Sequence, residues 1–178
     1  MSEAPKLPPQ LTVENAQSLS EADLNDLCDA TDAAIASGGG FGWVHLPARE
    51  ILERYWQGVM AMPNRMLFVA RLDGTICGTC QLVFTPRNNE AQSKGAHLTT
   101  TFVTPWARGY GLARRVVEAA ENAARKEGIE VLNLDVRETQ DAAIALYESM
   151  GYTHWGTHPH YAVIDGAHIS GRFYYKQL

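Results

Sequence analysis

The sequence lacks a long apolar run, an excess of basic residues and enough cysteines for a disulfide framework. No apolar stretch in its 178 residues is long enough to span a bilayer, and no charged segment followed by an apolar one indicates a signal peptide. The 15 Lys and Arg residues against 20 Asp and Glu give a net charge of −5, which argues against a nucleic-acid-binding protein. An odd number of cysteines, three, is typical of a reducing compartment. We therefore expect a cytoplasmic protein that binds neither a membrane nor nucleic acid.

Two of the cysteines, Cys77 and Cys80, form a C-x-x-C pair, a pattern that also occurs in redox and zinc sites. The residues around them, 75–82, follow a strand pattern, in which side chains three positions apart point to opposite faces. No second pair follows in the sequence to complete the four ligands of a zinc site. Buried thiols are therefore favoured over a metal or redox site.

Hydrophobic periodicity and turn residues predict a mixed α/β fold. Residues 1–10 are polar and proline-rich and are expected to be flexible, while residues 11–178 should form a single domain. Helices are predicted at 20–37, 48–60, 112–127 and 141–150, and strands at 65–72, 75–84, 96–103, 131–136, 152–156, 161–164 and 170–177. The strand–helix–strand passage from 96 to 136 requires parallel neighbours, so a parallel pair should lie in the middle of the sheet.

A loop with two glycines, residues 108–113 (RGYGLA), lies between a predicted strand and the long helix 112–127. Gly109 and Gly111 allow the backbone to approach a ligand closely, and the helix N-terminus offers unpaired N–H groups and a partial positive charge. This combination suits a pyrophosphate. A dinucleotide-binding fingerprint would need a third glycine where the chain has Arg114, and the Gly-Lys-Ser/Thr of a P-loop is absent from the sequence.

Two motifs resemble those of the GNAT acetyltransferase superfamily. The R-x-x-G-x-A of residues 108–113 is similar to its Q/R-x-x-G-x-G/A signature. Residues 140–152, Q-x-x-A-x-x-L-Y-x-x-x-G-Y, are similar to its N-x-x-A-x-x-L-Y signature followed by G-[FY]. The order of predicted elements over residues 65–156 also agrees with the family. More narrowly, residues 37–43, 158–161 and 173–176 resemble segments of the tabtoxin-resistance acetyltransferases.

The superfamily resemblance implies a largely antiparallel sheet with a splayed central parallel pair, flanking helices, and acetyl-CoA as the acyl donor. Backbone groups near Phe102 and Val103 should pair with the pantetheine arm on the splayed strand. Gln140 replaces the more usual asparagine of the family; its amide keeps a donor and an acceptor, but its reach differs. The pyrophosphate should be bound by the loop and the start of the helix, at Arg108, Gly109, Tyr110, Gly111, Leu112, Ala113 and Arg114.

Acyl transfer to an amine requires a neutral amine and a proton for the leaving thiolate. Tyr147 stands where the family places its general acid, and a phenol with a pKa near ~10 can protonate a thiolate with a pKa of roughly 8.5. A Tyr147 that merely packs a helix against the sheet is the alternative.

The resemblance also implies candidates for the base. In the tabtoxin-resistance subgroup, carboxylates on two neighbouring strands are assigned to the acceptor and base role, and the matching positions here are His97 and Asp135. An imidazole titrates near ~6.5, so it can accept a proton at neutral pH. Strand alternation places His97 on one face with residues 99, 101 and 103 unless a bulge intervenes. A structural, hydrogen-bonded role for His97 and Asp135 is the alternative.

The acceptor side is expected to involve Phe41, Trp43, His160 and Tyr161. The bulky 41–43 loop favours a closed pocket for a small molecule over an open peptide groove. A metal site at His158 and His160 is not favoured, because no further carboxylate or cysteine ligand lies in register in the sequence. Residues 20–37 carry five acidic residues and no Lys or Arg, which indicates either a solvated helix face or a negative rim that attracts a cationic amine.

These features predict an acetyl-CoA-dependent N-acetyltransferase that acts on a primary amine of a small molecule. We expect that molecule to resemble an amino acid, a toxin or an antibiotic, and it could be cationic. The alternatives are a protein or peptide N-acetyltransferase and a catalytically silent acyl-CoA-binding regulatory module. No metal is expected, and a homodimer is compatible with the sequence.

Overall fold

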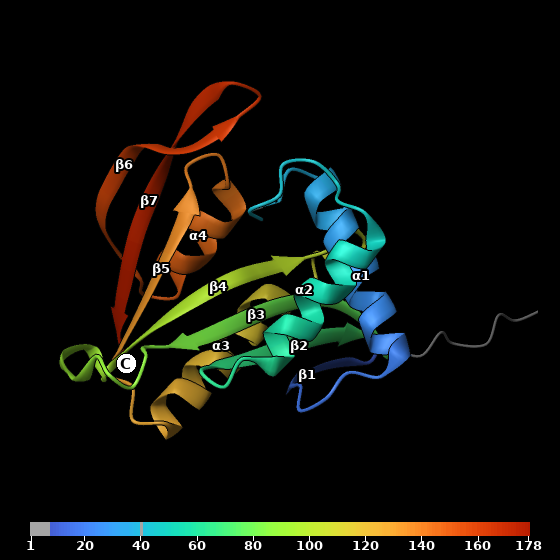
Figure 1. Ribbon diagram of the computed structural model, residues 1–178, viewed down its shortest axis with the longest axis horizontal. Helices are drawn as coiled ribbons and strands as arrows, with labels where there is room; N and C mark the ends of the chain where they lie inside the picture. Colours follow the sequence, from blue (N-terminus) through green and yellow to red (C-terminus); the bar gives the residue numbers. More distant parts are fainter. Residues whose placement is uncertain (1–7, 40) are drawn as a thin grey trace, which may run out of the picture.

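The computed structural model describes residues 8–39 and 41–178 and contains one mixed sheet with helices against both faces (Figure 1). The strand order is β1-β2-β3-β4-β5-β7-β6, and the neighbouring pairs are antiparallel except for β4 and β5. The prediction of a largely antiparallel sheet with a central parallel pair is therefore confirmed.

The helices and strands follow the predicted order, and those from 20 to 150 agree with the prediction to within one residue at each end. The strands are β1 (Leu11–Asn15), β2 (Arg65–Leu72), β3 (Thr75–Phe84), β4 (Gly95–Val103), β5 (Val131–Arg137), β6 (Thr153–Ile164) and β7 (Ala167–Gln177). The helices are α1 (Glu21–Ala36), α2 (Arg49–Ala61), α3 (Leu112–Lys126) and α4 (Asp141–Ser149), with short 3-10 turns at Glu90–Gln92 and Pro105–Ala107. Within residues 8–39 and 41–178, no helix combines the length and apolar character needed to cross a bilayer.

Strand β1 is missing from the sequence-based prediction. Its five residues form an edge strand that pairs antiparallel with β2, so that Val13 lies opposite Ala70. Residues 1–7 lie outside the described residues, and the predicted flexible segment 1–10 is described only at its end. There Gln10 and Asp73 exchange two hydrogen bonds of 2.8 Å, which tie the chain to the β2–β3 turn.

The two strands predicted at 152–156 and 161–164 form one irregular strand, β6. His158 lies opposite Gly171 and Ala162 opposite Ile169, so residues 159–161 of β6 face a single residue of β7. This bulge contains Pro159, which has no N–H to donate to the ladder. The break in the alternating pattern is the reason that the sequence reads as two strands.

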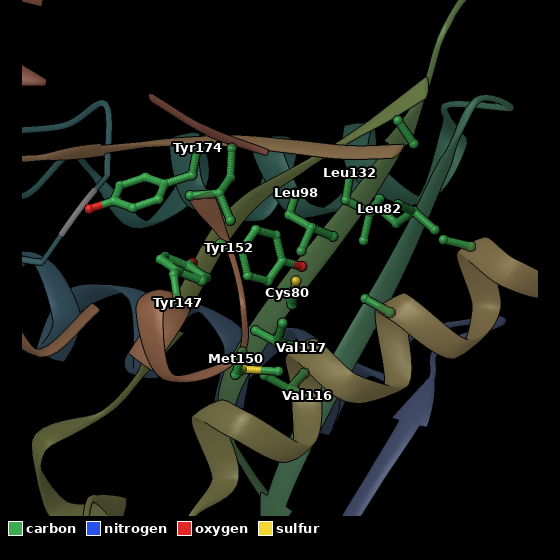
Figure 2. Packing of buried hydrophobic residues seen from close by; sticks show 14 of the residues in the cluster. Cys80, Leu82, Leu98, Val116, Val117, Leu132, Tyr147, Met150, Tyr152 and Tyr174 are labelled. Atoms are coloured by element: carbon green, nitrogen blue, oxygen red, sulfur yellow. The ribbon is translucent and has the colours of Figure 1, made fainter. Parts of the chain in front are cut away.

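Two apolar clusters hold the helices against opposite faces of the sheet. On one face, Val116 and Val117 of α3 belong to the same cluster as Tyr147 of α4 (Figure 2). On the other face, α1 and α2 pack through residues such as Trp56, which is fully buried and donates its indole N–H to Thr31 Oγ1 at 3.1 Å. That hydrogen bond satisfies the one polar atom of the indole.

All three cysteines are free and buried. The prediction that Cys77 and Cys80 point to opposite faces is wrong, because both belong to clusters that contain residues of α3. The cause is a register shift in the β2–β3 pairing, where Ala70 lies opposite Gly78 and Arg71 opposite Ile76, which leaves Cys77 as an extra residue. Burial raises the pKa of the Cys80 thiol to about 12, so this thiol stays protonated.

Helix α1 begins with a capping box, in which the Ser20 and Asp23 side chains each accept a hydrogen bond of 3.1 Å from the other residue's backbone N–H. Asp23 also forms an ion pair of 2.7 Å with Arg71. Asp26 accepts a hydrogen bond of 3.0 Å from the backbone N–H of Ile76. These acidic residues of α1 therefore attach the helix to β2 and β3, a role that neither predicted alternative included.

Strands β4 and β5 pair over Gly95–His97 and Val131–Asn133 and then diverge toward their C-terminal ends (Figure 1). In the diverging part, β4 contains a bulge at Thr100, whose φ is 53°. Leu98 packs on the α3 side of the sheet, whereas Phe102 packs on the α1 side. The bulge therefore breaks the alternation, so the stated exception applies and residues 97, 99, 101 and 103 do not share one face.

Candidate active site

Two cavities open where β4 and β5 diverge. The first, of about 640 Å³, lies between the end of β4, the start of α3 and α4; we call it the α3-side cavity. The second, of about 560 Å³, lies between β4, β5, residues 41–44 and β6; we call it the β6-side cavity. Both cavities are lined by Thr101, Gln140, Ala143 and Tyr147. A group bound in one cavity can therefore meet a group bound in the other at these four residues.

The loop before α3 has the backbone geometry that an anion site requires. Gly109 and Gly111 have φ values of 87° and 72°, in the left-handed region that favours glycine. A Cβ added at either position would meet no described atom within 4 Å, so the space beside both residues is open. Among the described residues, no side chain caps the N-terminus of α3. The first N–H groups of this helix are thus free to bind phosphate oxygens.

The other predicted residues of this loop have separate contacts. Arg108 and Ala113 line the α3-side cavity, and Arg108 Nη2 lies 3.4 Å from Ser37 Oγ. Arg114 reaches the end of α4, where its Nη2 donates to Ser149 Oγ at 2.6 Å. Leu112 is buried and attaches the helix to the core, whereas Tyr110 is exposed.

Phe102 and Val103 also line the α3-side cavity, at the end of β4 that follows the bulge. Here β3 and β4 approach each other closely, because a Cβ on Gly78 would lie 2.7 Å from the carbonyl oxygen of Phe102. The Phe102 ring packs against Phe41, with ring centroids 5.0 Å apart. The β4 backbone at these residues is therefore fixed from both sides.

Tyr147 lies where the two cavities meet. Its side chain is buried, and its ring packs edge-on against Tyr152 at 5.6 Å (Figure 2). Burial raises the pKa of Tyr147 and the nearby Cys80 adds to this shift, while a hydrogen bond with Thr101 opposes it. The phenol stays protonated at neutral pH, so it is available as a proton donor.

Asp135 of β5 links His97 of β4 to Tyr161 of β6. Asp135 Oδ1 lies 2.9 Å from His97 Nε2, and Oδ2 accepts a hydrogen bond from the Tyr161 hydroxyl. The hydrogen bond with His97 is the main cause that lowers the pKa of Asp135; burial opposes the shift, and the hydrogen bond from Tyr161 adds to it. Asp135 is therefore a carboxylate at neutral pH.

The three linked residues do not all reach the same space. Asp135 and Tyr161 line the β6-side cavity. His97 instead lines a separate cavity of about 560 Å³ farther down the same two strands, together with Lys94 and Asn133. His97 is therefore connected to the β6-side cavity through its hydrogen bond with Asp135.

Comparison with known proteins identifies the family. Residues 31–152 match the acetyltransferase (GNAT) family. Over 130 residues, which are 73% of this chain and 77% of the relative, the sequence is 62% identical to an uncharacterised N-acetyltransferase of Azospirillum brasilense encoded in the hisH–hisA intergenic region. The chain belongs to the GNAT acetyltransferase family.

Solved structures with low sequence identity share the fold of this acetyltransferase. An N-acetyltransferase from Staphylococcus aureus Mu50 superposes with a TM-score of 0.80 at 17% identity, over 94% of this chain and 98% of that one. YncA from Salmonella typhimurium, solved with its cofactor acetyl-CoA, superposes with a TM-score of 0.77 at 18% identity, over 95% of this chain and 94% of that one. The predictions of an acetyltransferase enzyme and of the GNAT fold are therefore confirmed.

In this acetyltransferase, the loop of residues 37–43 borders both cavities. Its first part lines the α3-side cavity, and Phe41 and Gly42 line the β6-side cavity. Arg137 donates to the carbonyl oxygen of Phe41, and Gln140 Nε2 donates to that of Gly38 at 2.7 Å. The side chain of Gln140 thus contacts this loop, while residue 40 lies outside the described residues.

Two residues predicted for the acceptor side lie away from the β6-side cavity. Trp43 packs edge-on against Tyr55 of α2, with ring centroids 5.1 Å apart. His160 is exposed and its ring packs against His168 at 4.7 Å, because the β6 bulge turns it outward. In the part of the chain that the structure describes, no three His, Cys, Asp or Glu side chains are grouped closely enough to hold a metal ion.

Sequence reasoning did not include Thr101 and Arg137 among the candidate site residues. Thr101 lines both cavities, and Arg137 lines the β6-side cavity and holds residue 41. Strand alternation after residue 97 could have brought Thr101 to attention, but only the bulge decides which cavities it reaches. No local signal indicates Arg137, whose partner is 96 positions away in the sequence.

Proposed function

We propose that this acetyltransferase transfers the acetyl group of acetyl-CoA to a primary amine of a small molecule. One observation carries the proposal: the α3-side cavity and the β6-side cavity meet at Tyr147 and Thr101. The first cavity is assigned to the donor and the second to the acceptor. Acetyl-CoA supplies an acetyl group that is activated as a thioester.

The residues around the α3-side cavity fit such a donor. The open, left-handed glycines 109 and 111 and the uncapped N-terminus of α3 offer backbone N–H groups to the pyrophosphate. Arg108 lies beside them and adds positive charge. Phe102 and Val103 would offer backbone groups of the diverging strand to the pantetheine arm.

The β6-side cavity fits a small acceptor better than a peptide. Residues 41–44 close it on one side and residues 161–164 of β6 close it on another. Its charged lining includes the carboxylate of Asp135, which suits an ammonium group. Phe41, Val44 and Ile164 provide apolar walls for the rest of the molecule.

The reaction needs one proton removed from the amine and one donated to the leaving sulfur, and residues at the junction of the two cavities can do both. Asp135 would hold the incoming ammonium group. His97, which is hydrogen-bonded to Asp135, would take up the proton that the ammonium group releases. Tyr147 would donate its proton to the sulfur as the thiolate leaves, since its pKa is raised and it stays protonated beforehand.

A release assay for free thiol, run with acetyl-CoA against a panel of small amines and short peptides, tests this proposal. We expect turnover with at least one small amine and a rise in melting temperature with acetyl-CoA, but not with NAD or ATP. Turnover with peptides alone would make the protein or peptide acetyltransferase the correct alternative. Binding of acetyl-CoA without turnover of any amine would favour the catalytically silent module.

The narrower assignments remain proposals. An acceptor that resembles an amino acid, a toxin or an antibiotic follows from the resemblance of the 37–43 loop and the C-terminal segments to tabtoxin-resistance acetyltransferases. The amine panel should therefore include amino acids and amino-acid-like antibiotics. A single-domain organisation, a cytoplasmic location and a homodimer likewise remain predictions.

A further inference from the structure

A polar network runs through the sheet beside the bulge of β4. Gln81 of β3 is fully buried; its Nε2 donates to the Tyr55 hydroxyl at 3.0 Å, and its Oε1 accepts from Arg65 Nη1. The Tyr55 hydroxyl in turn lies 3.4 Å from Thr100 Oγ1. Buried polar groups cost free energy unless they are hydrogen-bonded. Here hydrogen bonds link Arg65 to Gln81 and Gln81 to Tyr55, although Arg65 Nε has no partner among the described residues. The network ends at Thr100.

Thr100 is the residue that needs such support. Its φ of 53° places a β-branched residue in the left-handed region, where it is a genuine outlier. Conformations of this kind persist only where the surrounding structure holds them, and they cluster at functional sites. Thr79 provides a second stabilising contact, because its buried hydroxyl donates a hydrogen bond to the carbonyl oxygen of Thr100 at 2.7 Å. Thr100 is thus held at both its carbonyl and its side chain.

The bulge determines which residue reaches the meeting point of the cavities. Gln81 lies opposite Thr99 and Thr79 lies opposite Phe102, so residues 100 and 101 together face Cys80. The extra residue turns Thr101 to the α3 side, where its hydroxyl donates to Cys80 Sγ at 3.3 Å. In a regular strand Thr101 would share a face with His97 and would lie away from Tyr147.

We propose that Thr79, Tyr55 and Gln81 are positioning residues, which hold the strained bulge at Thr100 and thereby place Thr101 beside Tyr147. Trp43 packs against Tyr55, so the same network also contacts the loop that borders the acceptor side. The inference rests on the proposed function only in taking the α3-side cavity as the donor site.

The test begins with Thr79→Val, which keeps the shape of the side chain and removes its hydroxyl. The bulge should relax, and acetyl-CoA affinity, measured by titration calorimetry, should fall about tenfold as residues 101–103 shift. Thr85→Val is the matched control, because the Thr85 hydroxyl donates to the carbonyl oxygen of Gly95, at the other end of β4, at 3.1 Å. Its affinity for acetyl-CoA should equal that of the wild type.

Rescue separates positioning from a merely structural role. Glycine adopts positive φ without strain, so a glycine at position 100 should keep the bulge with much less dependence on the hydrogen bond from Thr79. In the Thr79→Val, Thr100→Gly double variant, the affinity for acetyl-CoA should return to within about threefold of the wild type. Tyr55→Phe, which removes only the hydroxyl, should weaken binding by about threefold and should be rescued in the same way.

The outcomes are distinct. A wild-type protein that binds no acetyl-CoA would overturn the proposed function. A wild type that binds acetyl-CoA, together with a Thr79→Val variant that binds equally well, would overturn the positioning role alone. Weak binding by Thr79→Val that Thr100→Gly does not restore would also overturn it, because the loss would not then act through the strained residue.

Discussion

The ring of Tyr161 lies directly against the Cα of Gly171, so that a Cβ at position 171 would overlap the ring. The bulge at residues 159–161 brings Tyr161 across β7, and from there its hydroxyl reaches Asp135. We predict that Gly171→Ala displaces this ring and lowers the free energy of unfolding by roughly 1–3 kcal/mol, as overpacking does. Denaturant unfolding measures the change, and acetyl transfer to an amine should fall with it.

Gly156→Ala is the matched control for this prediction. Gly156 lies on the neighbouring strand β6, and an added Cβ there would meet no described atom within 4 Å. We expect this variant to unfold within about 0.5 kcal/mol of the wild type, as surface substitutions usually do. Equal losses for the two alanine variants would mean that the Tyr161 contact contributes nothing specific.

Much of the fold could be predicted because its signals are local. The helix boundaries follow from capping residues and from apolar spacing, as at Ser20 and Gly128. The turn at Asp73 and Gly74 likewise predicts the β2–β3 hairpin, and the glycines at 109 and 111 predict a loop before α3 whose backbone a ligand can approach closely.

The rest depends on neighbours that the sequence does not show. The bulge at Thr100 lies in a run of threonines without a glycine or proline to indicate it. The hydrogen bond that stabilises it comes from Thr79, on another strand. Strand β1 has only five residues, too few for its alternating pattern to predict a strand from the sequence, and it is formed by pairing with β2. The bulge of β6 is also invisible in the sequence. It turns Tyr161 into the β6-side cavity and leaves His160, which the sequence predicts to be on the acceptor side, outside that cavity.

The lowered pKa of Asp135 predicts a pH-dependent contribution to stability. Because the folded-state pKa lies below the usual value of 3.8, the contribution is fully present above that value and is lost as the pH falls through the folded-state pKa. Asp135→Asn should therefore destabilise the protein clearly at pH 6, and the cost should shrink as the pH is lowered below 3.8 toward the folded-state pKa. Urea unfolding across this pH range checks the prediction, and a cost that is independent of pH would contradict it.

Gly111 separates backbone strain from close approach to the ligand. Valine at this position is disfavoured by the φ of 72°, whereas asparagine tolerates left-handed backbone. We predict that Gly111→Val lowers the free energy of unfolding by roughly 1–2 kcal/mol and that Gly111→Asn lowers it little. Both variants should raise KM for acetyl-CoA, because either side chain fills the space beside the loop.

The control for Gly111 is Gly74→Val in the β2–β3 turn, where φ is 88° and the space beside the residue is also open. It should lose similar stability with an unchanged KM. A Gly111→Asn variant with normal KM would show that only the backbone conformation matters at this position.

The last prediction tests leaving-group protonation at Tyr147. Tyr147→Phe keeps the ring and its packing against Tyr152 and removes only the hydroxyl. If that hydroxyl protonates the leaving thiolate, kcat and kcat/KM should fall together by about 10- to 10³-fold, with the affinity for acetyl-CoA little changed. A donor whose thiol is more acidic should recover part of this loss, since its thiolate needs a proton less. Steady-state kinetics with the two donors decide the question. A variant with normal kcat on acetyl-CoA would leave Tyr147 as a packing residue, and equal losses with both donors would assign the hydroxyl a role other than protonation of the thiolate.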